Sequence, residues 1–122
     1  MTRVKEDKVR EDRIMMEVVV DAYNEEERAM GWYYYVSEEA EFPFEAECIE
    51  ERRVSPLKKG EKVKVLQTAP AEDCEREIFV EIEWSGRTMG VPLSQLKPVN
   101  VDSKTQEVVE DWHYWTSQGY EF

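Results

Sequence analysis

The sequence is poor in the side chains that most often hold transition metals or form catalytic pairs. It contains one histidine, His113, and two cysteines, Cys48 and Cys74. The spacing of the cysteines matches no zinc-binding pattern, and no second cysteine pair accompanies them. A Cys–His pair also needs a group that orients the histidine, and the sequence indicates none. We therefore expect two reduced thiols, a histidine that packs or hydrogen-bonds, and no enzyme activity.

Long apolar runs and the common ligand-binding loops are also missing. No stretch approaches the roughly 18 apolar residues that a membrane span needs, and residues 1–13 alternate basic and acidic side chains instead of forming a secretory signal. The sequence has no phosphate loop, no dinucleotide fingerprint and no EF-hand loop. We expect a cytoplasmic protein without membrane association, in which any calcium site is built from separate segments or one irregular loop.

Acidic side chains are abundant and unevenly distributed. The 122 residues include 28 acidic and 16 basic side chains, for a net charge of −12. Residues 17–51 carry twelve acidic groups and only Arg28, and residues 72–85 carry six and only Arg76. Residues 52–71, between these blocks, carry six basic groups and only Glu61. Such a chain repels nucleic acids and anionic lipids, and it attracts cations or basic partners. Composition alone leaves two explanations open, a solvated acidic face or a bound cation that relieves the repulsion.

Two helices are predicted before residue 43. Apolar residues recur every four positions over residues 3–22, although the three valines at 18–20 favour a strand. Asn24 and Glu27 have capping-box spacing, so a second helix should begin after Asn24 and end before Pro43. Four consecutive aromatic residues follow Gly31, and because they cannot all face inward, we expect one or two of them to be exposed.

The middle of the chain alternates apolar and polar residues and predicts short antiparallel strands. The clearest strand covers residues 78–84, and Ser85-Gly86 forms a tight-turn signal after it. A third helix should begin near Asp102 or Ser103 and stop at Gly119, before a docked aromatic tail. The predicted fold class is α+β, in one domain spanning residues 1–122. A small antiparallel SH3-like β-barrel or sheet, about residues 44–98, is flanked by two N-terminal helices and one C-terminal helix.

The first candidate metal site is the acidic stretch after the second helix. Glu38, Glu39 and Glu41 lie within four residues at the predicted helix end. Calcium takes six to eight oxygen ligands from carboxylates, carbonyls and water, in flexible geometry. A helix end supplies free backbone carbonyls beside these carboxylates. A solvated acidic surface is the alternative interpretation of this stretch and of the next two.

Two further stretches are rich in oxygen donors. The loop before the clearest strand carries Glu72, Asp73 and Glu75, and the turn between the first two helices carries Asp21, with Asn24 and Glu25 nearby. A short Asp next to longer Glu side chains in a loop is a plausible arrangement of cation ligands.

Several unusual segments resemble one known family. They are Val-Asp-Ala-Tyr at 20–23, Met-Gly-Trp-Tyr-Tyr-Tyr at 30–35, Phe-Pro-Phe at 42–44, Val-Pro-Leu-Ser-Gln-Leu-Lys-Pro at 91–98, Glu-Asp-Trp-His-Tyr-Trp at 110–115 and Gln-Gly-Tyr-Glu-Phe at 118–122. From about residue 11 onward the chain resembles the CcbP family of cyanobacterial calcium-binding proteins. The resemblance implies a soluble acidic protein that binds Ca²⁺ outside the EF-hand scheme, in a family associated with calcium buffering during cell differentiation. It also implies that Glu38 and Glu39 are ligands.

The leading functional hypothesis is a monomeric intracellular calcium buffer or sensor that binds Ca²⁺ through clustered carboxylates. The alternative is an acidic SH3-like interaction module that binds a basic protein partner independently of calcium. The two differ in their response to a chelator and in how steeply partner binding falls with salt.

Overall fold

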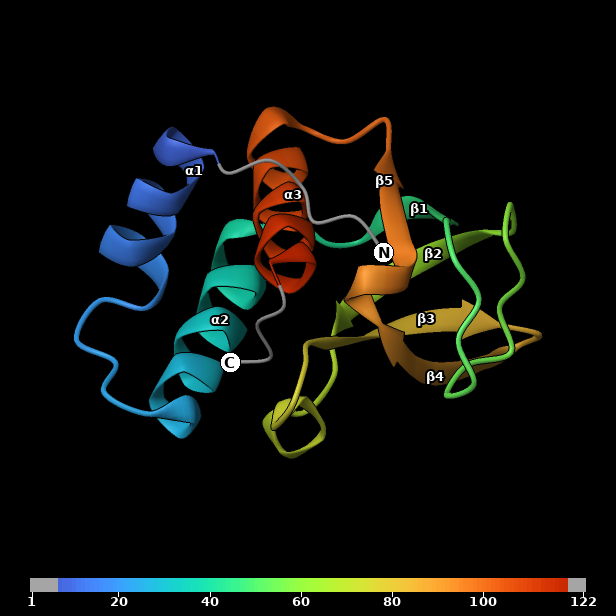
Figure 1. Cartoon of the computed structure of the whole chain (residues 1–122). Helices are drawn as coiled ribbons and strands as arrows, with labels where there is room; N and C mark the ends of the chain where they lie inside the picture. The colour runs from blue at the N-terminus through green and yellow to red at the C-terminus, as the bar shows by residue number, and fades with distance from the viewer. Residues whose placement is uncertain (1–6, 119–122) are drawn as a thin grey trace.

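The protein, as a computed structural model, has a helical half beside an antiparallel sheet (Figure 1). The structure describes residues 7–118. The α+β class predicted from the sequence is confirmed, with three α-helices and five strands in this part of the chain. None of the described helices is both long enough and apolar enough to cross a membrane.

The first helix is shorter than predicted and changes its winding. Helix α1 (Lys8–Arg13) begins after Asp7, whose side chain accepts a hydrogen bond from the Arg10 N–H, and continues into a π-helix, η1 (Ile14–Val18). The predicted extension to residue 22 is wrong, because the chain leaves the helix at Val19 and Asp21 adopts a positive φ of 59°. The β-branched valines disfavour continuation, and Asp tolerates the left-handed conformation. The predicted start at residue 3 lies outside the described residues.

Helix α2 (Glu25–Glu39) begins where the capping pattern places it. The Asn24 side chain accepts a hydrogen bond from the Glu27 N–H at 2.8 Å, which satisfies one of the helix's free donors. Trp32 and Tyr35 are buried, whereas Tyr34 is 52% exposed. The expectation that the aromatic run could not face inward throughout is therefore confirmed.

Helix α3 (Ser103–Ser117) packs on α2 through aromatic side chains. Asp102 is its cap and accepts from the Thr105 N–H. The Trp32 ring lies 5.0 Å from Trp112 and 5.6 Å from Trp115, between ring centroids. Such tilted aromatic pairs bury large apolar area and fix the helix–helix contact. The predicted stop at Gly119 and the docked tail after it lie outside the described residues.

The sheet has five antiparallel strands in the order β4-β3-β2-β1-β5. The strands are β1 (Phe44–Cys48), β2 (Lys62–Thr68), β3 (Phe79–Trp84), β4 (Arg87–Pro92) and β5 (Leu96–Val99). Two short 3₁₀ turns, η2 (Ala71–Cys74) and η3 (Leu93–Gln95), interrupt the connections. The predicted antiparallel sheet is confirmed as an open sheet, and the SH3-like closure into a barrel stays a prediction.

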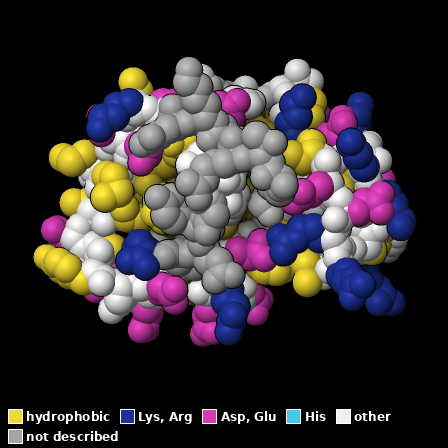
Figure 2. Space-filling view, in the orientation of Figure 1, with side chains coloured by type: hydrophobic (Ala, Val, Ile, Leu, Met, Phe, Trp, Pro, Cys, Tyr) yellow, Lys and Arg dark blue, Asp and Glu magenta, His cyan; other side chains and the backbone are white. Residues whose placement is uncertain are grey.

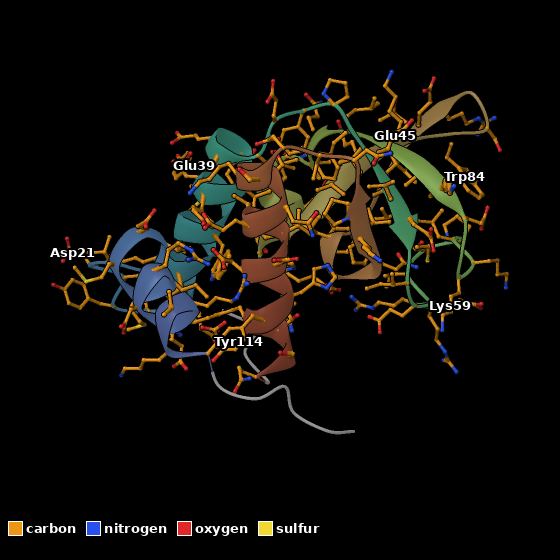
Figure 3. All side chains as sticks on the ribbon, turned by 90° about the horizontal axis from the view of Figure 1, so that it is seen from above. Asp21, Glu39, Glu45, Lys59, Trp84 and Tyr114 are labelled. Atoms are coloured by element: carbon orange, nitrogen blue, oxygen red, sulfur yellow. The ribbon has the colours of Figure 1, made fainter. Side chains whose placement is uncertain are left out.

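The basic part of the chain is residues 52–64, which span most of the β1–β2 connection and the start of β2 and are called the basic loop below. Residues 52–64 hold six Lys or Arg side chains and one acidic group, Glu61. Arg52 is paired with Glu77 at 2.7 Å, and the exposed Lys58 is paired with Glu51 at 3.6 Å. Lys59 is also exposed. Figure 3 shows Lys59 and Asp21 at opposite ends of the molecule. The acidic helical half and the basic loop are therefore separated in space as well as in sequence.

Candidate metal site

Glu38 and Glu39 occupy the last turn of α2, where both are exposed. This turn contains no basic residue. The carboxyl end of a helix carries the negative end of the macrodipole and leaves backbone carbonyls without intrahelical partners. Two carboxylates at this end raise the negative potential where Lys or Arg is normally favoured. The end of α2 therefore attracts a cation through both its side chains and its backbone.

Glu41 lies beside the start of α3. Its backbone N–H donates to the Thr105 hydroxyl at 2.8 Å, and that hydroxyl donates to Asp102. Glu41, Glu45, Asn100 and Asp102 line one hollow of about 430 Å³. Hydrogen bonds from the Thr105 hydroxyl and backbone lower the pKa of the Asp102 carboxyl, so this group stays ionised in mildly acidic solution. Three carboxylates and one amide therefore face a common space.

Lys104 is a partly exposed cation whose charge interacts with Glu39 at this end of α2. Its Nζ lies 3.0 Å from Glu107 and 5.4 Å from the centre of the Tyr35 ring. Burial opposes its charge, but the hydrogen bond to Glu107 and the charges of Glu107, Glu17 and Glu39 outweigh that effect, so the pKa of Lys104 is raised. Lys104 stays charged and offsets part of the negative potential at Glu39.

The remaining predicted ligands lie near the other end of α2. Glu72 and Glu75 line a hollow of about 550 Å³ together with Glu25 and Glu26 of α2. Asp21 lines a neighbouring hollow with Glu26 and Glu27. Asp73 is exposed, and its backbone N–H donates to the Pro70 carbonyl at 2.8 Å. The structure thus brings Glu72 and Glu75 beside Glu25, which the sequence placed in a separate oxygen-rich stretch, and beside Glu26, which it did not single out.

Helix α2 separates these two groups of acids. Its 15 residues correspond to about 22 Å at the rise of an α-helix, and Figure 3 shows Asp21 and Glu39 near its opposite ends. Within residues 7–118, no three His, Cys, Asp or Glu side chains are grouped closely enough to hold a metal ion. A cation at either end would take carboxylate, carbonyl and water oxygens, and the exposed Glu side chains would have to rotate toward it. This donor set suits a hard cation with flexible coordination.

Sequence reasoning missed Glu45, Asn100 and Asp102 because only the fold places them beside Glu41. Asn100 has a positive φ of 53°, which is common for Asn in a tight turn. The turn brings the start of α3 back to β1. A polar Val-Asn-Val-Asp stretch between a strand and a helix was the available signal, but it does not specify which carboxylate it approaches.

The thiols and the histidine lie apart from these acids. Cys48 and Cys74 are buried, and burial raises the pKa of both thiols. His113 is partly buried and its Nε2 lies 2.6 Å from the Leu96 carbonyl oxygen. The oxygen-rich ends of α2 are therefore the chemically distinctive part of the described chain.

These observations define a small acidic α+β protein with oxygen-rich candidate cation sites at the ends of one helix. The chain belongs to the CcbP family, whose model is described as calcium binding and matches residues 12–116. The resemblance seen in the sequence is thereby confirmed. The search of the curated proteins gave no match.

Two solved structures are similar over their whole length. The crystal structure of Anabaena CcbP is 40% identical to this chain, with a TM-score of 0.87 and 100% of both chains covered. A calcium-binding protein in its calcium-binding form is 39% identical, with a TM-score of 0.86 and 100% of both chains covered.

Proposed function

We propose that this protein binds Ca²⁺ at the carboxyl end of α2, with Glu38 and Glu39 as ligands and Glu41 as a further contributor. The observation that carries the proposal is the pair of exposed carboxylates at the negative end of the α2 dipole, in a turn without a basic residue. Family membership and the calcium-binding form of a 39% identical protein support the choice of ion.

The available donors favour calcium over softer metals. Both thiols are buried and His113 contacts a backbone carbonyl, so zinc and copper lack their preferred ligands. Magnesium demands six ligands in near-ideal octahedral geometry, whereas calcium accepts irregular sets of carboxylate, carbonyl and water oxygens. Exposed glutamates on a helix end provide the irregular kind of set.

Glu72, Asp73, Glu75 and Asp21 are proposed as ligands of a second, weaker site. The amino end of α2, where the two hollows lie, carries the positive end of the helix dipole, which opposes a cation there. Glu25, Glu26 and Glu27 already interact favourably with that end. This difference between the two ends ranks Glu38 and Glu39 first.

We further propose that the chain is a single-domain, monomeric, intracellular calcium buffer or sensor with an SH3-like sheet, and that it has no enzyme activity. The mixture of acids and a competing Lys104 at the first site suits reversible binding. A sensor would change shape on binding and a buffer would not. Tryptophan emission distinguishes a sensor from a buffer, because Trp32 of α2 packs against Trp112 and Trp115 of α3 and would report a shift between these helices.

Calorimetric titration with Ca²⁺ tests the ligand assignment. Glu38→Gln with Glu39→Gln is expected to weaken the tighter site at least about tenfold, which is roughly 1.4 kcal/mol. The matched control is Glu50→Gln with Glu51→Gln, an adjacent exposed pair beyond the far end of β1, which makes the same change in charge. Equal weakening of calcium affinity in both variants would show that the effect comes from the change in net charge and not from the loss of specific ligands. If the heat of calcium binding is lost only in the variant with Glu72→Gln and Glu75→Gln, the tighter site lies at the amino end of α2.

A further inference from the structure

Exposed apolar side chains are concentrated on the helical half. Seven of the eight large hydrophobic side chains that are exposed in residues 7–118 belong to α1, η1, α2 or the turn before α2. They are Val9, Met15, Met16, Val20, Tyr23, Met30 and Tyr34, and the eighth is Val54. Figure 2 shows hydrophobic side chains gathered over the α1–α2 side of the molecule. Exposed apolar clusters of this kind mark interaction sites.

Part of this surface is hollowed. Five residues with apolar or no side chains, Val18, Val20, Ala22, Met30 and Gly31, line a hollow of about 370 Å³, together with three acids, Asp21, Glu26 and Glu27. We call this hollow the η1–α2 groove. The fold enforces its shape, because a Cβ on Gly31 would lie 2.2 Å from the Val18 carbonyl oxygen. The glycine allows η1 to lie directly against α2.

The groove continues across α2. Met30 and Glu26 also line the second hollow described above, of about 550 Å³, which reaches Tyr33 on one side and η2 on the other. Glu25, Glu72 and Glu75 are the acids of that part. Met30 therefore lines both hollows, whose apolar residues are called the floor and whose acidic residues are called the rim below. A methionine adapts its shape to different partners at low energetic cost.

The charges around the groove select the occupant. Arg28 is the only basic residue between positions 14 and 51, and Arg13 is engaged with Asp111. An acidic rim repels nucleic acid and anionic lipid. A second copy would have to offer its own basic loop, in which Val54 is the only exposed large hydrophobic side chain. A helix with one apolar face and flanking Lys or Arg side chains matches both the floor and the rim.

We propose that the η1–α2 groove docks a basic amphipathic helical segment of another protein. The apolar face of the segment covers Val20 and Met30, and its basic side chains pair with Asp21, Glu26 and Glu27. This localises the interaction-module alternative to the helical half, away from the sheet. It does not rest on the tighter calcium site, because Glu38 and Glu39 are absent from the groove lining. Asp21 is shared with the proposed weaker calcium site, so the test is made in chelator.

Fluorescence anisotropy of a labelled probe peptide tests the proposal. The probe is a 16-residue leucine–lysine peptide with leucines on one helical face, titrated with the full chain in chelator at physiological salt. Val20→Asn with Met30→Gln changes no charge and should weaken binding by roughly tenfold or more, since central apolar anchors dominate such interfaces. Val54→Asn is the matched control and should leave the affinity unchanged. Melting temperatures of the variants verify that each is folded.

A peptide with the same composition but leucines distributed around the helix should bind at least about tenfold more weakly than the probe. Equal affinity of the two peptides, or no effect of the Val20 and Met30 substitutions, would reduce binding to nonspecific attraction and overturn the proposal. Sedimentation that shows dimers dissolved by the same substitutions would make a second copy the occupant and also overturn it. Probe binding that appears only after removal of residues 119–122 would make this segment the occupant of the groove and would also overturn the proposal. Calcium titration of the same variants is expected to stay normal, which separates this result from a failure of the calcium proposal.

Discussion

Asp111 is the buried charge that ties the helices together. It is 0% exposed, and its oxygens accept hydrogen bonds from Arg10 at 2.7 Å, from Arg13 at 2.6 and 3.0 Å, and from the Tyr35 hydroxyl at 2.7 Å. Burial and the bond to Asp111 raise the pKa of Tyr35. Helix α1 has no buried residue of its own, so these contacts account for much of its attachment to α3.

Replacement of Asp111 by Asn should therefore destabilise the fold strongly. The substitution leaves two arginines facing a neutral amide, and loss of one partner of a buried pair typically costs about 3 kcal/mol or more. Urea unfolding measures the loss. The neighbouring Glu110→Gln is the control, because Glu110 is 49% exposed and contacts Arg10 at only 3.4 Å; it should cost less than about 0.5 kcal/mol. A similar loss in the two variants would contradict the role of Asp111.

His113 should make stability depend on pH near neutrality. Burial lowers the pKa of His113 in the folded protein below its ordinary value of 6.5. As the pH falls through 6.5, the unfolded chain therefore takes up a proton before the folded protein does, so stability present above that pH is lost below it. Urea midpoints between about pH 7.5 and pH 5.5 should fall. His113→Gln keeps a donor for the Leu96 carbonyl and should flatten this slope; an unchanged slope would assign it to the carboxylates.

At the scale of elements, Gly31 determines how closely η1 and α2 approach. Alanine in place of glycine normally stabilises a helix by up to about 1 kcal/mol. Here the added Cβ would meet the backbone of Val18 at 2.2 Å, so one element has to shift. Gly31→Ala should therefore destabilise the protein by about 1–3 kcal/mol. Gly90→Ala in β4 is the control, because its nearest contact is an ordinary 3.9 Å to the Phe79 ring, and thermal unfolding compares the two.

Most of the elements could be predicted, and the failures have physical reasons. Periodicity and caps located α2, α3 and strand β3, because their apolar faces are long enough to give a clear pattern. Strand β5 was missed because Lys97-Pro98 interrupts the pattern; Pro98 is tolerated there because β5 lies at the edge of the sheet. The first helix was predicted too long because valines 18–20 fit an apolar helical stripe as well as a turn.

The site was predictable only in part. Residue type and charge clustering singled out Glu38, Glu39 and Glu41, and the sequence could not reveal that Glu45 and Asp102 face the same hollow as Glu41. Asp102 is about sixty positions from Glu41, so its place in this hollow depends on the sheet register and on the turn at Asn100. The same limit explains why the sequence could not show that Glu72 and Glu75 lie beside the amino end of α2.

At the scale of the whole molecule, calcium should stabilise the fold. A ligand that binds only the folded state adds about 2.7 kcal/mol at a hundred times its Kd, which corresponds to roughly 10 °C in Tm for a domain of this size. The net charge of −12 adds a nonspecific contribution from any divalent cation. Scanning calorimetry in Ca²⁺ and in the same concentration of Mg²⁺ separates the specific from the nonspecific contribution. Equal increases in Tm in the two ions would count against a specific calcium site.

The separation of the basic loop from the acidic helices makes the charge distribution of the molecule asymmetric. A sequence with an isoelectric point of about 4.6 is usually treated as uniformly anionic, yet residues 52–64 carry six basic groups and one acidic group. In a nonuniform electrostatic field the molecule therefore experiences a torque as well as a net force.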